Sequence, residues 1–268
     1  MSSEPPLTAG TPAELPDLSA DSGDPAPWGG TPVAAGRGLA WWQEGWRLFA
    51  AAPWLWIGMT FTMVVLLFVL ALIPLLGHIA STLLYPILGA GLLVGAREID
   101  RGGTLRFEHL FACFDARVGP LIIAALLYLV GWFLVWLIAI GICAIMFGLS
   151  SLSALMNVDP SIASIETLVT LGIAVIVALL LVLVLGTPLM MAYWFAPALI
   201  ALRGDPPIAA LKASFRASLR NVPPMLVYGL LFIVFAIVAS IPMGLGWIVL
   251  APVFAISVYV SYRDIFGR

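Results

Sequence analysis

The chain has 268 residues, of which 62% are hydrophobic and only 10% are charged, and its mean hydropathy is +1.10. A soluble domain carries roughly a quarter of its residues as charged ones, so this composition excludes a water-soluble globular protein. The formal net charge is −2, and no soluble segment alternates basic and stacking aromatic residues, so the sequence predicts no nucleic-acid partner. The separated Cys113 and Cys143 and the two histidines predict neither a disulfide nor a metal site, and no cofactor is expected.

The N-terminal residues 1–36 differ from the rest of the chain. They are rich in Pro, Ser, Thr, Gly and acidic residues and have no periodicity, so they cannot bury enough apolar surface to fold. The basic region and apolar core of a signal peptide are missing. The sequence therefore predicts a disordered cytosolic tail over residues 1–36, followed by a transmembrane domain over residues 37–268.

Four long stretches without a formal charge follow the tail. They cover residues 48–96, 118–158, 167–202 and 221–262. Since about 20 apolar residues cross the hydrocarbon core once, the first and last stretches each allow two crossings. The sequence predicts an all-α integral membrane protein with six transmembrane helices. The third and fourth helices are longer than one crossing needs, so they are expected to tilt strongly or to extend beyond the outer surface.

A short amphipathic segment precedes the first crossing, at residues 39–50. Leu39, Trp42, Trp46 and Phe49 recur at helical spacing and share one face. Tryptophan suits the headgroup layer of a bilayer because its ring is apolar while its N–H is polar. We therefore expect Trp42 and Trp46 to contact lipid headgroups.

Two further amphipathic segments precede later crossings, at residues 107–114 and 208–221. In the second of these, Lys212, Arg216 and Arg220 lie four residues apart and form a cationic stripe beside the apolar face. The stripe is interpreted either as a solvated face that fixes topology or as a contact for anionic headgroups, worth about 1 kcal/mol per basic residue. Membrane lipids are the expected partners.

These segments indicate three repeats of a surface helix, a proline and an apolar hairpin. All twelve Lys and Arg residues fall before, between or after the hairpins, on the side opposite to the loops at their tips. The positive-inside rule then predicts that both termini are cytosolic. Gly91 and Gly95 fit close helix packing, either within the bundle or in an oligomer.

Chemistry-bearing residues are sparse. No Asp, Glu, Lys or Arg lies within a predicted crossing, which disfavours an ion-driven carrier. The loop after the second crossing could form an enzyme's acid–base cluster from Glu98, Asp100, Glu108, His109 and Asp115. That loop also holds four arginines, so a neutralised loop is the preferred interpretation and no catalytic residue is predicted.

Several short motifs carry a resemblance to known proteins. They are Gly-Trp-Arg-Leu-Phe at 45–49, Trp-Phe-Ala-Pro-Ala-Leu at 194–199, Ser-Phe-Arg-Ala at 214–217 with Asn221 and Pro224, and Ser-Tyr-Arg-Asp-Ile-Phe at 261–266. The chain resembles a family of uncharacterised proteobacterial inner-membrane proteins over residues 39–266. It is more distantly similar to the membrane domain of glycerophosphodiester phosphodiesterases. The resemblance implies a multi-pass protein of the bacterial inner membrane and brings no activity with it.

The sequence thus favours a non-enzymatic inner-membrane protein, active in lipid handling or membrane scaffolding at the cytosolic interface. The alternative is a transporter or channel for a small or amphipathic solute, with helices kinked at Pro86, Pro188 and Pro252 as gates. A continuous polar cavity through the bundle would favour this alternative.

Overall fold

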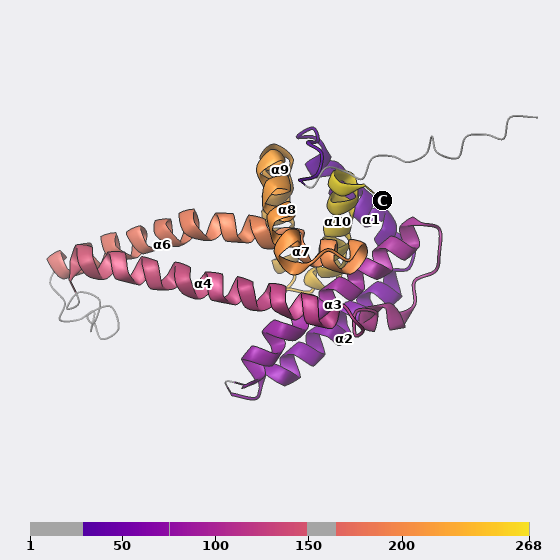
Figure 1. Ribbon diagram of the computed structural model, residues 1–268, viewed down its shortest axis with the longest axis horizontal. Coiled ribbons are helices and arrows are strands. Elements are labelled where there is room, and N and C mark those ends of the chain that lie inside the picture. Colours follow the sequence, from indigo (N-terminus) through magenta and orange to yellow (C-terminus); the bar gives the residue numbers. More distant parts are fainter. Residues whose placement is uncertain (1–28, 75, 149–164, 268) are drawn as a thin grey trace, which may run out of the picture.

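The computed structural model describes residues 29–74, 76–148 and 165–267, and the described chain is helical, with turns and short loops between the helices (Figure 1). The helices in chain order are α1 (Arg37–Ala50), α2 (Pro53–Ala71), α3 (Leu76–Asp100), η2 (Phe107–Phe111), α4 (Val118–Phe147), α6 (Ile165–Trp194), α7 (Ala196–Ala198), η3 (Leu199–Arg203), α8 (Pro207–Arg220), α9 (Val222–Ser240) and α10 (Trp247–Phe266). The predicted all-α class is confirmed.

Within this described part, six helical segments are long and apolar enough to cross a membrane, as predicted. They are Pro53–Ala71, Ile79–Asp100, Val118–Met146, Leu168–Arg203, Val222–Ser240 and Trp247–Phe266. The last two are joined by a tight turn in which Met243 and Gly244 both have positive φ angles, of 53° and 83°. Glycine adopts this conformation freely, which lets the chain reverse direction within a few residues.

Helices α3 and α10 form the centre of the packed region. Helix α10 contacts α1, α2, α3 and α9, and α3 also contacts η2 and α4. Leu88 of α3 and Ile256 and Val260 of α10 have no exposed surface. Small residues allow the close approach: a Cβ on Gly45 of α1 would lie 3.2 Å from the backbone of Ser257. The core is therefore built around the second and sixth crossings.

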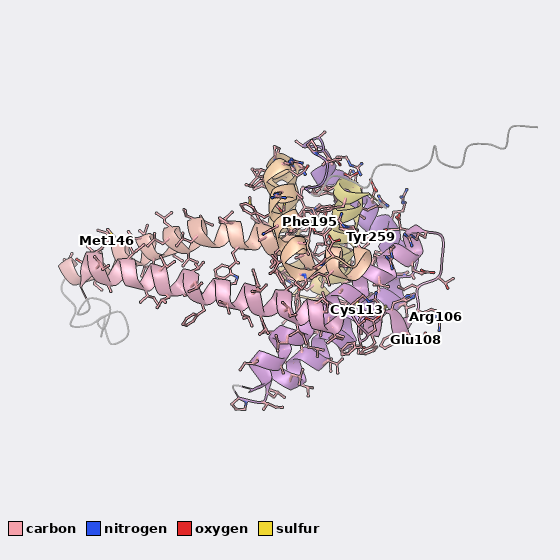
Figure 2. The ribbon with its side chains drawn as sticks, in the orientation of Figure 1. Arg106, Glu108, Cys113, Met146, Phe195 and Tyr259 are labelled. Carbon is pink, nitrogen blue, oxygen red and sulfur yellow. The ribbon has the colours of Figure 1, made fainter. Side chains whose placement is uncertain are left out.

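The hairpin of α4 and α6 extends away from this packed region (Figure 1). Each of its helices has 30 residues, which at about 1.5 Å per residue gives about 45 Å, against roughly 30 Å for a hydrocarbon core. Figure 2 shows Met146 at the far end of the hairpin, while Phe195, Cys113 and Tyr259 lie in the packed region. The expected excess length of these two helices is confirmed; the loop between them lies outside the described residues.

The segments that precede the hairpins are not equivalent. Residues 39–50 and 208–221 are largely helical, as α1 and α8, but the expected surface helix at 107–114 is wrong: the chain forms only the short 3₁₀ helix η2 there. A Cβ on Gly91 would lie 2.2 Å from the carbonyl oxygen of Leu110, so contact with α3 shapes this segment. The threefold repeat stays a prediction.

The predicted tail, residues 1–36, lies outside the described residues up to position 28. Residues 29–36 are described, and Gly29 and Gly30 are buried against α8 and α10. The packed chain therefore includes residues that the sequence assigned to the tail.

Candidate functional site

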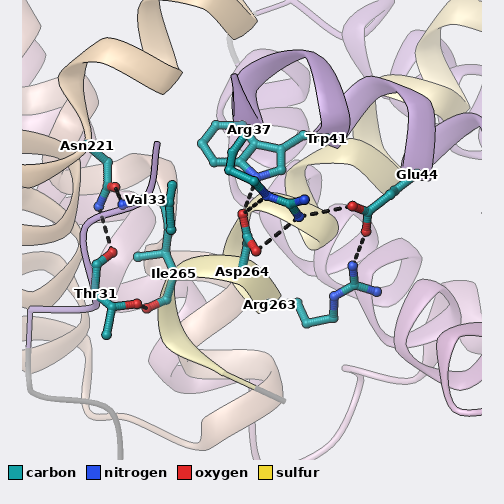
Figure 3. Close-up of polar contacts among 9 residues, drawn as sticks. All are labelled: Thr31, Val33, Arg37, Trp41, Glu44, Asn221, Arg263, Asp264 and Ile265. Atoms are coloured by element: carbon teal, nitrogen blue, oxygen red, sulfur yellow. Dashed lines mark hydrogen bonds and ion pairs between the residues drawn. The ribbon is translucent and has the colours of Figure 1, made fainter. Parts of the chain in front are cut away.

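A chain of charged side chains joins α1, α3 and α10 at one end of the bundle. Asp100, at the end of α3, pairs with Arg263 of α10 and accepts a hydrogen bond from the Tyr259 hydroxyl at 3.0 Å. Arg263 also pairs with Glu44 of α1 (Figure 3). The side chains of Asp100 and Arg263 are only 5% and 11% exposed. Three helices that are distant in sequence are thus held together by buried ion pairs.

Arg37, at the start of α1, completes this charged chain. Its guanidinium binds Asp264 in a bidentate manner, with Nε–Oδ2 and Nη2–Oδ1 distances of 2.6 and 3.0 Å. It also donates to Glu44 at 2.9 Å, while the Trp41 indole donates to Asp264 at 2.9 Å (Figure 3). The contact with Asp264 raises the pKa of Arg37 above its usual value. Such two-point pairing fixes geometry as well as charge.

We name these five residues, Arg37, Glu44, Asp100, Arg263 and Asp264, the charged network. Every carboxylate and guanidinium in it has a partner of opposite charge. Removing one partner of the buried Asp100–Arg263 pair leaves an uncompensated charge, which is strongly destabilising. The arrangement therefore suits a structural role, in which the ion pairs hold helices together, rather than a site that exchanges protons or binds a metal.

Asn221, between α8 and α9, extends this polar end to the N-terminal segment. Its side chain has no exposed surface and accepts from the Val33 N–H at 2.8 Å, while its Nδ2 donates to the carbonyls of Thr31 and Ala217. The Thr31 N–H donates to the carbonyl of Ile265 in α10 at 2.9 Å (Figure 3). The side-chain amide of Asn221 thus links Thr31 and Val33 to α8, close to the end of α10.

The motif at 194–199 forms the break between α6 and α7. Pro197 cannot donate a backbone hydrogen bond, which interrupts the helix. The N–H of Phe195 donates to the Ser214 hydroxyl of α8 at 2.9 Å. Ser214 in turn donates to the carbonyl of Met191 at 2.7 Å. The Phe195 ring is buried and lies 5.6 Å from that of Phe266. The motifs at 194–199, 214–217 and 261–266 therefore contact one another and join α6, α8 and α10.

Basic groups of three of the four predicted cytosolic segments make contacts there. Arg37 meets Asp264, Arg263 meets Asp100, and Arg97 donates to the Leu202 carbonyl at 3.0 Å. These contacts agree with the prediction that the Lys and Arg residues lie at one end of the helix bundle. Which side of the membrane this end faces stays a prediction.

Of the residues predicted to contact headgroups, Trp42 is placed differently. Its side chain is 4% exposed, stacks on Tyr228 with ring centroids 4.9 Å apart, and donates to the Tyr228 carbonyl at 3.2 Å. The expectation for Trp42 is corrected: its ring is covered by α9 and α10 instead of lipid. Trp46 remains 54% exposed.

The cationic stripe of α8 lies on the surface. Lys212, Arg216 and Arg220 are all exposed, and Arg220 donates to the carbonyl of Gly30 at 3.4 Å. None of the three forms an ion pair with another residue in the described parts of the chain. The structure thus brings these three residues together on one face, as the spacing predicted.

The acids of the loop after α3 are separated. Asp115 is exposed and pairs with Arg117, whose hydrogen bonds lower the pKa of Asp115 to about 2. Glu108 pairs with Arg106, and Asp100 belongs to the charged network. Burial raises the pKa of the Cys113 thiol. No group of three or more potential metal ligands occurs among residues 29–74, 76–148 and 165–267.

The bundle contains an apolar cavity of about 450 Å³. It lies between α2, α3, the end of α6, α9 and α10, beyond the charged network. Its lining includes Thr60 and Met63 of α2, Gly89 of α3, and Trp194 and Phe254. A smaller hollow of about 270 Å³ lies between α4 and α6 and contains Trp136 and Cys143 in its wall. Sequence reasoning missed both, because the lining residues look like ordinary membrane-helix residues.

Comparison with known proteins identifies two likenesses. The family model described as a domain of unknown function, DUF7847, matches residues 126–262. A probable inner membrane protein of Burkholderia thailandensis is 28% identical over 262 residues, covering 88% of this chain and 93% of that protein. No solved structure matches the chain.

Proposed function

The chain belongs to the family of the domain of unknown function DUF7847, and on this premise we propose that it is a non-enzymatic protein of the bacterial inner membrane that acts on lipids at the cytosolic interface. Its role there is lipid handling or scaffolding of the membrane. The similarity to a probable inner membrane protein supports the location. The predicted link to the membrane domain of glycerophosphodiester phosphodiesterases would fit such a role and stays part of this proposal.

The observation that carries the proposal is the surface of α8. Lys212 and Arg216 are exposed and have no carboxylate partner within the described chain, whereas Arg37, Arg117, Arg203 and Arg263 all pair with acids. Their charges are therefore available to anionic headgroups, at about 1 kcal/mol each near the surface. The exposed rings of Phe107, Phe111 and Phe114, 40–50% exposed, add an apolar surface suited to the interfacial layer.

The test is the preference of the purified protein for anionic lipid. The protein is reconstituted with phosphatidylglycerol and phosphatidylcholine, and the bound lipids are counted by native mass spectrometry. Arg216→Gln is expected to weaken the preference for phosphatidylglycerol about fivefold, since one basic residue is worth about 1 kcal/mol. The control Arg106→Gln removes a charge that already has a partner, Glu108, and should change little. A wild-type protein that retains no more phosphatidylglycerol than an unrelated membrane protein would refute the proposal.

The cavity favours a second candidate, a carrier for an apolar or amphipathic solute. Pro86 lies in its wall, and Pro86, Pro188 and Pro252 each lie inside a helix, as the gating hypothesis requires. The cavity wall contains no charged residue, so this candidate concerns apolar solutes rather than ions. Proteoliposomes that move no lipophilic solute faster than empty liposomes would eliminate it.

A further inference from the structure

The apolar cavity is a slot with two unlike walls. One wall is a row of aromatic rings from α6, α10 and α9: Trp194 lies 6.2 Å from Phe254, Phe254 lies 4.9 Å from Phe232, and Phe232 lies 6.1 Å from Trp247. The other wall comes from α2 and α3 and is mainly aliphatic, with Thr60 and Gly89 among its residues. Neighbouring rings in this row are tilted or edge to face, with interplanar angles of 86°, 46° and 73°. Aromatic rings pack favourably on other rings in edge-to-face as well as offset-stacked arrangements, so the first wall favours a ligand that carries a ring.

Thr60 gives the slot a buried polar group on its α2 wall. Its side chain is 8% exposed, and Oγ1 is a buried side-chain oxygen for which the described residues provide no hydrogen-bond partner. An unpaired buried hydroxyl costs about 1–3 kcal/mol, and the hydrocarbon core holds no water to satisfy it. A ligand that brings an acceptor oxygen to this place would remove that cost.

The depth of Thr60 limits the kind of ligand. Helix α2 begins at Pro53 next to Trp54, which is 84% exposed and suits the membrane interface. At about 1.5 Å per residue, Thr60 lies about 10 Å further along the helix. The ester groups of phospholipids stay in the interfacial layer, so an acyl chain at this depth would bring only methylene groups and leave the hydroxyl unpaired.

The slot is also accessible from the membrane. Val64, Tyr85 and Trp247 line it and are 56%, 54% and 39% exposed, whereas Ala90 and Leu93 close its inner side and are buried. A volume of about 450 Å³ lies within the range of small-molecule sites. The opening would let a long apolar tail continue into the lipid.

We propose that this cavity binds a membrane quinone, a neutral lipid whose planar ring carries carbonyl oxygens and whose isoprenoid tail dissolves in hydrocarbon. The ring packs against the row formed by Trp194, Phe254 and Phe232. A ring carbonyl accepts a hydrogen bond from the Thr60 hydroxyl once the Thr60 side chain rotates to present this buried oxygen to the cavity. The proposal concerns binding and does not rest on the headgroup contacts of α8, so either can fail without the other.

Binding is tested by titrating the purified full-length protein in mild detergent with decylubiquinone. Quinones quench tryptophan fluorescence, and Trp194 and Trp247 line the cavity, so a saturable quench is expected. Thr60→Val keeps the volume and removes the donor, and it should weaken binding about fivefold, the ratio expected for one neutral hydrogen bond.

A second pair of variants tests the location. A Cβ on Gly89 meets nothing within 4 Å, so Gly89→Leu can fold while filling the slot, and it should weaken binding at least tenfold. Gly229 of α9 also has open space around its Cα but does not line the cavity, so Gly229→Leu is the matched control and should bind like the wild type. Thermal unfolding of each variant shows whether it is folded.

Three results would overturn the proposal. They are a quench that does not saturate, equal binding by the wild type and Thr60→Val, and equal loss in Gly89→Leu and Gly229→Leu. The lipids extracted from protein purified out of native membranes give an independent measurement. Quinone in that extract supports the proposal, whereas phospholipid alone, displaced by Gly89→Leu, would identify the slot as an acyl-chain site instead.

Discussion

Two regions of the molecule can be compared: the packed region around α3 and α10, and the hairpin of α4 and α6. Both consist of helices that are apolar enough to cross a membrane, but they differ in the share of their residues that is buried inside the molecule. In their most apolar stretches, 56% of the residues of α10 are buried inside the molecule, against 6% for the span that contains α6. The more buried helix is also the less apolar of the two. Helix contacts inside a membrane use small and polar residues, while lipid tails already solvate apolar ones. High apolarity in this chain therefore indicates contact with lipid rather than with the core.

The largest expected effect comes from breaking the charged network, which only the packed region has. Arg263→Ala leaves Asp100 and Glu44 without this partner, and the loss of one member of a buried pair costs about 3–5 kcal/mol in the free energy of unfolding. Unfolding in detergent, followed by helical circular dichroism, measures it. Arg106→Ala is the control, because Arg106 and Glu108 are 65% and 74% exposed, and such a surface pair contributes about 1 kcal/mol or less. Equal effects of the two variants would contradict a fastening role for the network.

A pair of leucine truncations compares the two regions directly. Leu88→Ala in α3 removes a side chain with no exposed surface, and the cavity left behind should cost about 2–4 kcal/mol. Leu179→Ala in α6 removes one that is 61% exposed and should cost little, because lipid or detergent fills the space. The same unfolding measurement applies, and a larger loss for Leu179→Ala would reverse the comparison.

Glycine substitutions test the close contacts on a smaller scale. A Cβ at Gly91 would lie 2.2 Å from a backbone carbonyl, so Gly91→Ala must shift η2 and should cost about 1–3 kcal/mol. Gly141 of α4 has open space, so Gly141→Ala should be neutral or slightly stabilising, since alanine favours the helix more than glycine. The difference in thermal midpoint between the two variants is the readout.

Labelling of the two cysteines compares how easily each region opens, and it perturbs the protein less than the substitutions above. Cys113 packs in the core beside α3, and Cys143 lies between α4 and α6 with Sγ 4.0 Å from the Ala174 carbonyl. Single-cysteine variants are treated with a lipid-soluble maleimide during heating, and we expect Cys143 to react at a lower temperature. The raised pKa of Cys113 also predicts slow labelling near neutral pH that accelerates as the pH rises and more thiolate forms. Labelling of Cys113 before Cys143 would show that the core opens first.

Much of the fold follows from one-dimensional patterns. Length and the absence of charge predicted six crossings because a helix in lipid must bond its own backbone and needs a fixed length of apolar chain. The same reasoning could not place Trp42, since an amphipathic face suits either lipid or a neighbouring helix, and here α9 covers it. It also could not find the charged network, because Glu44 and Arg263 are far apart in sequence and only the packing of α1 on α10 brings them together.

For the candidate site, the spacing of Lys212, Arg216 and Arg220 was enough to predict a shared exposed face. The apolar cavity could not be predicted from the sequence, because its existence depends on how well side chains from five segments fill the space between them. A single threonine among apolar neighbours looks unremarkable in sequence, and only the structure shows that the described chain leaves the Thr60 hydroxyl unpaired.

The hydrogen bond between Thr31 and Ile265 also has a bearing on biosynthesis. Residues 31–33 can bind Asn221 as soon as α8 has been made, but the contact with α10 forms only after Ile265 has left the ribosome. Helix α1 must likewise wait for α10 before the ion pairs between them can form. We therefore expect nascent chains that end before residue 263 to insert into the bilayer yet leave α1 accessible to proteases, until synthesis of Arg263 and Asp264 supplies its ionic partners.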